Sequence, residues 1–277
     1  MSKKITYDYC NKLVKEFEKV VKNPIKERSS FYYTGVDLGT SCVVIAVLDE
    51  NKRPVAGAYR YASVVKDGMI VDYVGAVKIV RELKEEIEKK LGVTLTYAAA
   101  AIPPGTDKLD GGVVKNVVEA AGFELTDLSD ESTAANEVLQ IKNGVIVDVG
   151  GGTTGISVFK DGKVVYIADE PTGGTHFSLV IAGAYRMPFE EAELFKRNKK
   201  NYNEVFGLLV PVIEKVASII ETHIKDYKIE EICLVGGTTC LDEIEKIIEN
   251  KTGIKTTKPK NPMFVTPLGI ALSCKHK

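Results

Sequence analysis

The feature that most constrains this chain is a glycine-rich turn with apolar segments on both sides. Residues 145–149 read as a buried strand that carries Asp148, and residues 150–154 (Gly-Gly-Gly-Thr-Thr) read as a turn. Residues 156–159 and 163–168 then read as two further strands, separated by an Asp-Gly turn. The glycine turn therefore joins strand to strand, whereas the dinucleotide-binding fingerprint and the P-loop lead from a strand into a helix. No GxxxxGK[ST] motif occurs in the chain.

Such a hairpin can hold a phosphate group. Its three glycines leave backbone N–H groups unobstructed, and successive N–H groups in a turn form a concave anion site. Thr153 adds a hydroxyl donor, and Asp148 lies at the strand end, where a carboxylate can hold a metal-bound water. The turn therefore predicts a site for a phosphate and a hydrated cation.

The pattern occurs a second time, earlier in the chain. Residues 33–38 read as a strand that carries Asp37, residues 39–41 (Gly-Thr-Ser) form the turn, and residues 42–48 read as the next strand. The spacing between Asp37 and Asp148 is that of a small domain. We therefore expect an internal duplication into two similar lobes.

A third glycine turn, Gly236-Gly237, ends the apolar strand 232–235. One such turn is ordinary, but two hairpins followed by a Gly-Gly strand end resemble the nucleotide-binding superfamily of actin and the DnaK-type chaperones. The resemblance implies an α/β fold of the two-lobed actin-like (ribonuclease H-like) ATPase type, with duplicated lobes. It also implies ATP or ADP and Mg²⁺ between the lobes.

Composition narrows the function classes. The chain has 277 residues, a hydrophobic fraction of 44% and a net charge of −1, which argues against a general role on nucleic acid or membrane surfaces. No apolar segment has the length of a membrane span, and the N-terminus lacks the apolar region of a signal peptide. The five cysteines show no CxxC spacing and the three histidines show no zinc spacing. We expect a cytoplasmic protein with reduced thiols.

The chain divides into three parts. Residues 1–33 form an N-terminal segment, residues 34–142 form lobe I, and residues 143–263 form lobe II. Residues 264–277 read as a helix that returns to lobe I and completes it. Within the N-terminal segment, apolar residues recur at helical spacing from Tyr9 to Val21. This amphipathic helix either packs on its own lobe or docks another protein.

Other elements follow from caps and periodicity. Asp72 is placed to cap a helix over residues 73–91, and Asp130 is placed to cap one that begins at a strand end. Residues 240–250 read as a helix that ends at Gly253. Gly173 and Gly174 open a further helix, with His176 either near a phosphate or serving the turn.

Several stretches are similar to a narrower family, the EutJ proteins of ethanolamine utilisation. This family is regarded as chaperone-like and belongs to an operon whose enzymes work inside a bacterial microcompartment. The resemblance implies ethanolamine-pathway enzymes or microcompartment proteins as partners, and the microcompartment as a further location. The matching stretches are residues 35–40 (GVDLGT), 65–71 (VKDGMIV), 103–107 (PPGTD), 168–174 (ADEPTGG) and 190–193 (EEAE).

The superfamily resemblance also implies roles for individual residues. Asp37 and Asp148 would hold Mg²⁺ through its waters. Glu131 would orient the attacking water and act with Asp148 in catalysis. Glu193 and Lys196 match a Glu-x-x-Lys pair that holds the ribose, although a solvated helical face is the alternative reading. The other residues implied to contact nucleotide are Gly39, Thr40, Ser41, Gly150, Gly151, Gly152, Thr153, Gly173, Gly174, Gly236, Gly237 and Thr238.

The chain also departs from the chaperone pattern. No lysine matches the catalytic lysine of the chaperones, although Lys66 and Lys78 lie nearby in the sequence, and Ser132 replaces the proline common after the glutamate. Both outer subdomains read as reduced. These departures favour nucleotide binding over hydrolysis, so any ATPase activity should be slow.

Three functions remain open at this point. The first is a chaperone-like or scaffold protein that uses nucleotide to bias a two-lobed clamp. The second is an actin-like or pilus-type assembly protein in which nucleotide is structural. The third is a small-molecule kinase on the same fold, which would need a catalytic aspartate or histidine between the lobes, with candidates in residues 67–110.

Overall fold

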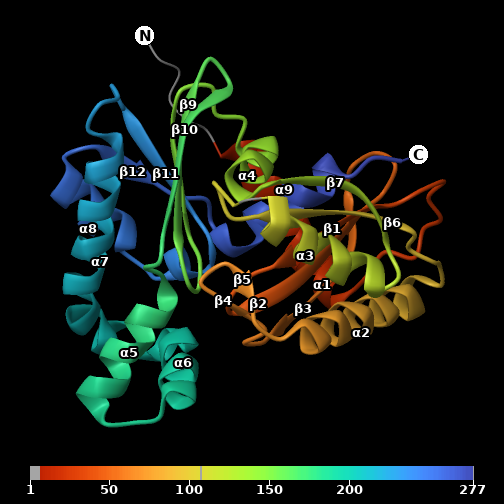
Figure 1. The fold of residues 1–277 in the computed structure, drawn as a ribbon, viewed down its shortest axis with the longest axis horizontal. Coiled ribbons are helices and arrows are strands. Elements are labelled where there is room, and N and C mark those ends of the chain that lie inside the picture. The colour runs from red at the N-terminus through yellow and green to blue at the C-terminus, as the bar shows by residue number, and fades with distance from the viewer. Residues whose placement is uncertain (1–6, 107, 277) are drawn as a thin grey trace.

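Two lobes, each built around a five-stranded sheet, make up the protein (Figure 1). The computed structural model describes residues 7–106 and 108–276, without the side chains of residues 108–110. The first six residues of the predicted N-terminal segment, Asp107 of the resembling stretch 103–107, and Lys277 lie outside the described residues. In Figure 1, lobe I lies on the right and lobe II on the left.

The sheet of lobe I has the order β3-β2-β1-β6-β7. Its first three strands form an antiparallel meander, and the other two add in parallel beside β1. Two helices cover one face, and a short hairpin, β4–β5, extends from the meander. The elements are β1 (Tyr33–Leu38), β2 (Cys42–Leu48), β3 (Pro54–Tyr61), β4 (Val65–Lys66), β5 (Met69–Ile70), α2 (Tyr73–Leu91), β6 (Tyr97–Ile102), α3 (Lys108–Ala120) and β7 (Glu124–Asp130).

Lobe II repeats this topology, with the order β10-β9-β8-β11-β12. It has again an antiparallel meander followed by two parallel strands. The predicted duplication is therefore confirmed. The elements are β8 (Gly144–Val149), β9 (Thr154–Lys160), β10 (Lys163–Glu170), α5 (Gly174–Tyr185), α6 (Phe189–Arg197), α7 (Tyr202–Ile224), β11 (Glu231–Val235), α8 (Ile244–Thr252) and β12 (Lys255–Thr257), with 3-10 turns η1 (Lys199–Asn201), η2 (Gly237–Cys240) and η3 (Pro262–Phe264).

Two helices, α4 (Glu131–Leu139) and α9 (Val265–Ser273), pack against each other between the lobes (Figure 1). Their approach is so close that a side chain at Gly269 would have its Cβ 1.7 Å from the carbonyl oxygen of Ala134. A Cβ at Gly35 of β1 would likewise lie 2.4 Å from the backbone nitrogen of Ala271. The C-terminal helix thus packs directly on the first strand of lobe I, as the sequence predicts.

Helix capping follows the sequence. The carboxylate of Asp72 accepts a hydrogen bond from the backbone N–H of Gly75 at the start of α2, and Asp130 accepts one from Thr133 at the start of α4. The predicted helix over residues 240–250 is partly wrong. A 3-10 turn ends at Cys240, Glu243 adopts a left-handed conformation with φ of 69°, and α8 begins only at Ile244.

The N-terminal helix α1 (Asp8–Lys22) packs on its own chain. Five apolar side chains on one face are buried together with residues of β2, α4, β11 and α9. The hypothesis that this face docks another protein is therefore wrong, because the face is already covered. The buried residues are Cys10, Leu13, Val14, Phe17 and Val20.

Within residues 7–106 and 108–276, no helix is both long and apolar enough to cross a membrane.

Candidate functional site

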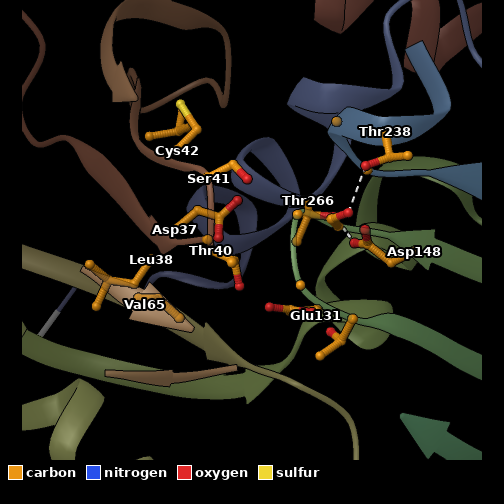
Figure 2. A pocket seen from close by; sticks show the side chains of 18 of the residues that line it. Asp37, Leu38, Thr40, Ser41, Cys42, Val65, Glu131, Asp148, Thr238 and Thr266 are labelled. Atoms are coloured by element: carbon orange, nitrogen blue, oxygen red, sulfur yellow. Dashed lines mark hydrogen bonds between the residues drawn. The ribbon is translucent and has the colours of Figure 1, made fainter. Parts of the chain in front are cut away.

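A cavity of about 170 Å³ lies between the lobes, where the two glycine hairpins and the β11 strand end meet. Figure 2 shows side chains from both lobes around one space. The structure brings fifteen of the seventeen predicted site residues to this cavity. They are Asp37, Gly39, Thr40, Ser41, Glu131, Asp148, Gly150, Gly151, Gly152, Thr153, Glu193, Lys196, Gly236, Gly237 and Thr238.

The two hairpins touch each other. A Cβ at Gly151 would lie 2.1 Å from Oγ of Ser41, and one at Gly152 would lie 2.9 Å from Oγ1 of Thr40. The turn of the β4–β5 hairpin also reaches across, because the same Gly152 Cβ would lie 3.0 Å from the backbone nitrogen of Asp67. Glycine at both positions is therefore required for the lobes to close this far.

Three carboxylates lie deep in the cavity. Asp37 and Asp148 occupy equivalent positions in β1 and β8, and Glu131 is the first residue of α4. Burial raises the pKa of Asp37 to about 7, assisted by the charge of Asp148. Burial raises the pKa of Asp148 to about 6, although Oδ2 accepts a hydrogen bond of 2.8 Å from Thr266, which acts in the opposite direction. Burial and the two aspartates together raise the pKa of Glu131 well above its usual value.

The basic side chains of the cavity do not balance this negative charge. Among the described residues, the lysine and arginine that line it are Lys196 and Arg197, and both bind Glu193 at 2.6 Å. The deep carboxylates therefore form a site with uncompensated negative charge, which a cation would stabilise. In the described part of the chain, no group of three or more His, Cys, Asp or Glu side chains is arranged to coordinate a metal ion directly.

Glu193 is the centre of a buried network on the lobe II side. Its carboxylate accepts hydrogen bonds from Ser178, Lys196 and Arg197, and it is only 8% exposed. Burial alone would raise the pKa of Glu193, but the charges of Lys196 and Arg197 and the hydrogen bonds from Lys196 and Ser178 together outweigh it and lower the pKa. Lys196 also donates a hydrogen bond of 2.7 Å to the carbonyl of Gly174. A solvated helical face is therefore the wrong interpretation of this pair.

Gly173 and Gly174 do not line the cavity, unlike the other predicted residues. They pack behind the second hairpin, where the N–H of Gly174 donates to the carbonyl of Gly150 at 3.0 Å. A Cβ at Gly173 would lie 2.8 Å from that carbonyl oxygen. His176 accepts a hydrogen bond of 3.4 Å from the N–H of Gly173, so it serves the turn. These residues position the hairpin.

Gly236 brings the β11 strand end against the deep carboxylates. Its φ of 92° favours glycine, and a Cβ there would lie 2.2 Å from Oδ1 of Asp148. The hydroxyl of Thr238 donates to the carbonyl of Gly150 at 2.6 Å. The third glycine turn is thus joined to the second hairpin through both residues.

Sequence reasoning missed several lining residues, and four of them bear on the site: Tyr61, Arg197, Met263 and Thr266. The guanidinium of Arg197 in lobe II lies over the ring of Tyr61 in lobe I, 3.8 Å from its centroid. Thr266 orients Asp148, and Met263 lines the wall beside it. Of these four residues, only Arg197 could have been suspected from the sequence, because it directly follows Lys196 of the Glu-x-x-Lys pair.

Asp169 is a fourth carboxylate near the site. It pairs with Gly155 across β9 and β10. Burial raises the pKa of Asp169 to about 6, although a hydrogen bond from Thr153 acts to lower it. Its Oδ1 is buried without a hydrogen-bond partner in the described structure. The sequence predicts a strand over residues 163–168 that ends just before Asp169, and it assigns this residue no role.

The lysines that the sequence left as candidates do not line the cavity. Lys78 is exposed and 3.9 Å from Glu82, and Lys66 lies in β4 outside the set of lining residues. From the described residues of 67–110, the cavity wall takes Gly68, Ile70, Ala101 and Pro103, none of which is an aspartate or histidine. The candidate segment thus places no such kinase residue among the described lining residues.

Comparison with known proteins agrees with this architecture. The family model described as "Type IV pilus assembly protein PilM" matches residues 119–265, just over half of the chain. The ethanolamine utilization protein EutJ of Salmonella typhimurium is 43% identical over 246 residues, which cover 88% of this chain and 86% of that protein.

Solved structures show the same relationship. The structure of the ethanolamine utilization protein EutJ from Carboxydothermus hydrogenoformans has a TM-score of 0.87 and 46% identity, covering 96% of this chain and 97% of that one. The structure of MreB5 of Spiroplasma citri bound to ADP has a TM-score of 0.70 at 18% identity and covers 88% of this chain and 96% of that one. At this level of identity the similarity shows a shared fold alone. The fold is the actin-like ATPase fold, as predicted. The chain belongs to the EutJ family of ethanolamine utilisation proteins.

Proposed function

We propose that this protein binds ATP or ADP with Mg²⁺ between its lobes and uses the nucleotide to set the position of a two-lobed clamp. The clamp would consist of lobe I (residues 34–142 with 264–277) and lobe II (residues 143–263). One observation carries the proposal: two glycine hairpins from duplicated lobes face each other beside three cavity carboxylates that have no basic partner among the described residues.

The residues present fit a hydrated cation. Asp37 and Asp148 would hold it through its waters, because Mg²⁺ keeps several waters and takes few protein carboxylates directly. The cation would supply positive charge beside the phosphates. The chain's own groups would do the rest: hairpin N–H groups bind phosphate oxygens, Thr266 holds the carboxylate of Asp148 in place, and Glu193 and Lys196 hold the ribose.

Hydrolysis would be slow in the isolated protein. No lysine besides Lys196 lines the cavity among the described residues, and Lys196 is committed to Glu193 and Gly174. The described side chains thus offer no free ammonium group where negative charge develops on a transferring phosphoryl group, and such electrostatic groups commonly lower barriers by a few kcal/mol. Glu131 would orient the attacking water.

The proposed client of the clamp rests on family membership. We infer that the partners are ethanolamine-pathway enzymes or microcompartment proteins, met in the cytoplasm or at a microcompartment, and that the role is chaperone-like. The relatives are named for ethanolamine utilisation, which supports this pathway. Co-purification of those enzymes with the protein in the presence of ATP, and their loss with ADP, would support it.

Calorimetry tests the nucleotide proposal directly. ATP should bind more tightly with Mg²⁺ than with EDTA, and Asp148→Asn should weaken Mg·ATP far more than free ATP. Equal loss of both would show that Asp148 is not near the metal. If neither ATP nor ADP binds under any condition, the proposal fails.

A second function is favoured by the match of the pilus assembly family model to residues 119–265. In that case nucleotide would stabilise an assembly, and the lobes would not cycle. Sedimentation velocity over a range of protein concentrations, with and without nucleotide, separates the two. A nucleotide-dependent increase in size with concentration would favour assembly, and a constant monomer would favour the clamp.

A further inference from the structure

The two glycine hairpins touch each other directly beside the cavity between the lobes. The turn of lobe II rests on the turn of lobe I, since a Cβ at Gly151 would overlap Oγ of Ser41 at 2.1 Å. A phosphate placed between the touching turns at Gly151 and Ser41 would require the lobes to move apart. Any element that ties the two lobes together therefore affects entry and release.

Helix α1 is firmly attached to lobe I. Its Phe17 is fully buried, and a Cβ at Gly57 of β3 would lie 2.3 Å from the Phe17 ring. The helix lies along β3, the edge strand of the lobe I sheet. Phe17 also meets the ring of Phe264, in the segment that connects lobe II to α9, with centroids 5.1 Å apart.

The same helix reaches lobe II through three polar contacts. The hydroxyl of Tyr7, just before the helix, shares a hydrogen bond of 2.6 Å with the hydroxyl of Thr257 in β12. The backbone N–H of Lys260 donates to Asn11 at 2.8 Å. The amide of Asn261 donates to Glu18 at 2.6 Å.

A row of ring contacts links α1 to the cavity rim. Arg197 of lobe II lies on Tyr61 of lobe I, Tyr61 meets Tyr59 at 5.8 Å, and Tyr59 meets Phe264 at 5.8 Å. Phe264 in turn packs on Phe17. The cross-lobe contact at the cavity and the helix that ties the lobes are thus parts of one packed row.

From these contacts we propose that α1 is a strap that holds the lobes closed and sets the rate at which nucleotide enters and leaves. The inference rests on the proposed nucleotide site. The strap moves with lobe I, because Phe17 packs tightly on Gly57 and the helix lies along β3. It releases lobe II at Tyr7, Asn11 and Glu18, whose polar contacts are half-buried or exposed and can be replaced by water.

The strap can be loosened without disturbing its apolar face. Tyr7→Phe, Asn11→Ala and Glu18→Ala each remove one contact to lobe II, and their combination removes all three. Asn11→Asp with Glu18→Gln is the matched control, because both replacements keep an acceptor oxygen. Lys15→Ala changes an exposed position of the same helix.

Two measurements report on the strap. The first is tryptophan fluorescence, which needs no nucleotide. Because the chain contains no tryptophan, Tyr61→Trp can be introduced in every variant to place a single fluorophore at the contact between the lobes. Acrylamide quenching of that tryptophan should rise in the triple variant and not in the controls. The second is stopped-flow release of a fluorescent ADP analogue, which should become about fivefold faster for each hydrogen bond removed.

The outcomes are decisive. Unchanged quenching and release in a folded triple variant would overturn the proposal and make α1 a fixed cover of lobe I. If the triple variant does not fold, Tyr7→Phe alone tests the same point, with a smaller expected effect. If the unmodified protein binds no nucleotide, the proposed function fails, whereas the quenching experiment still shows whether α1 holds the lobes together.

Discussion

The buried carboxylates should make the nucleotide-free protein more stable as the pH falls from 8 to about 5.5. A carboxyl group whose pKa is raised by folding binds its proton more tightly in the folded state than in the unfolded state. Its contribution to stability is complete below the unfolded pKa and is lost as the pH rises through the folded pKa. The ordinary aspartate pKa is 3.8, and the folded pKa values here are about 7 for Asp37 and about 6 for Asp148, so the loss spans about pH 4 to 7.

Asp148 gives the magnitude. It is 7% exposed, and its pKa rises from 3.8 to about 6. At 1.36 kcal/mol for each pKa unit, an isolated group with this shift would destabilise the folded state at pH 8 by ~3 kcal/mol. The neighbouring acids share part of this repulsion, so we expect about 2 kcal/mol from Asp148 alone.

Asp148→Asn tests the magnitude, because the amide keeps the shape and can still accept a hydrogen bond from Thr266. Urea unfolding in EDTA, without nucleotide, should show the variant more stable than the parent by about 2 kcal/mol at pH 8 and by about half as much near pH 5, and the two should become nearly equal near pH 4. Asp242→Asn, an exposed aspartate in lobe II, is the control. A variant that is less stable at pH 8, or a pH dependence equal to that of the parent, would refute the reasoning.

Three further outcomes are expected. Gly236→Ala should destabilise the folded protein by about 2–4 kcal/mol in urea unfolding, because backbone strain at φ of 92° adds to a clash with Asp148. The control Gly253→Ala, at φ of 66° with open space around it, should cost only about 1 kcal/mol. Equal losses of stability in the two variants would contradict the clash at Gly236. Phe17→Ala should cost about 3–5 kcal/mol, because the ring is fully buried, and a loss below 1 kcal/mol in the same assay would mean that α1 is not part of the core. In a coupled phosphate-release assay, the isolated protein should hydrolyse ATP more slowly than about 1 s⁻¹, the low end of ordinary kinases, and faster turnover would show that another group replaces the missing lysine.

The sequence alone determined the local chemistry of the site. The three glycine turns, each at the end of an apolar strand, can be recognised from short stretches of sequence. Glycine permits close approach of the backbone, and alternating or continuous apolar residues form strands. The repeated strand-turn-strand pattern is therefore enough to assign Asp37 and Asp148 to equivalent strand ends. The same local signals placed the caps at Asp72 and Asp130.

Only the tertiary structure decided how these pieces meet. Arg197 lies on Tyr61, and α1 bonds to residues 257–261, because the folded chain brings together segments that are far apart in the sequence. The helical period showed that α1 has an apolar face but could not show what covers it, since any buried surface of matching shape satisfies the same pattern. Gly173 and Gly174 illustrate the same limit. Glycine permits close approach to a ligand or to backbone, and here the neighbour is the hairpin itself.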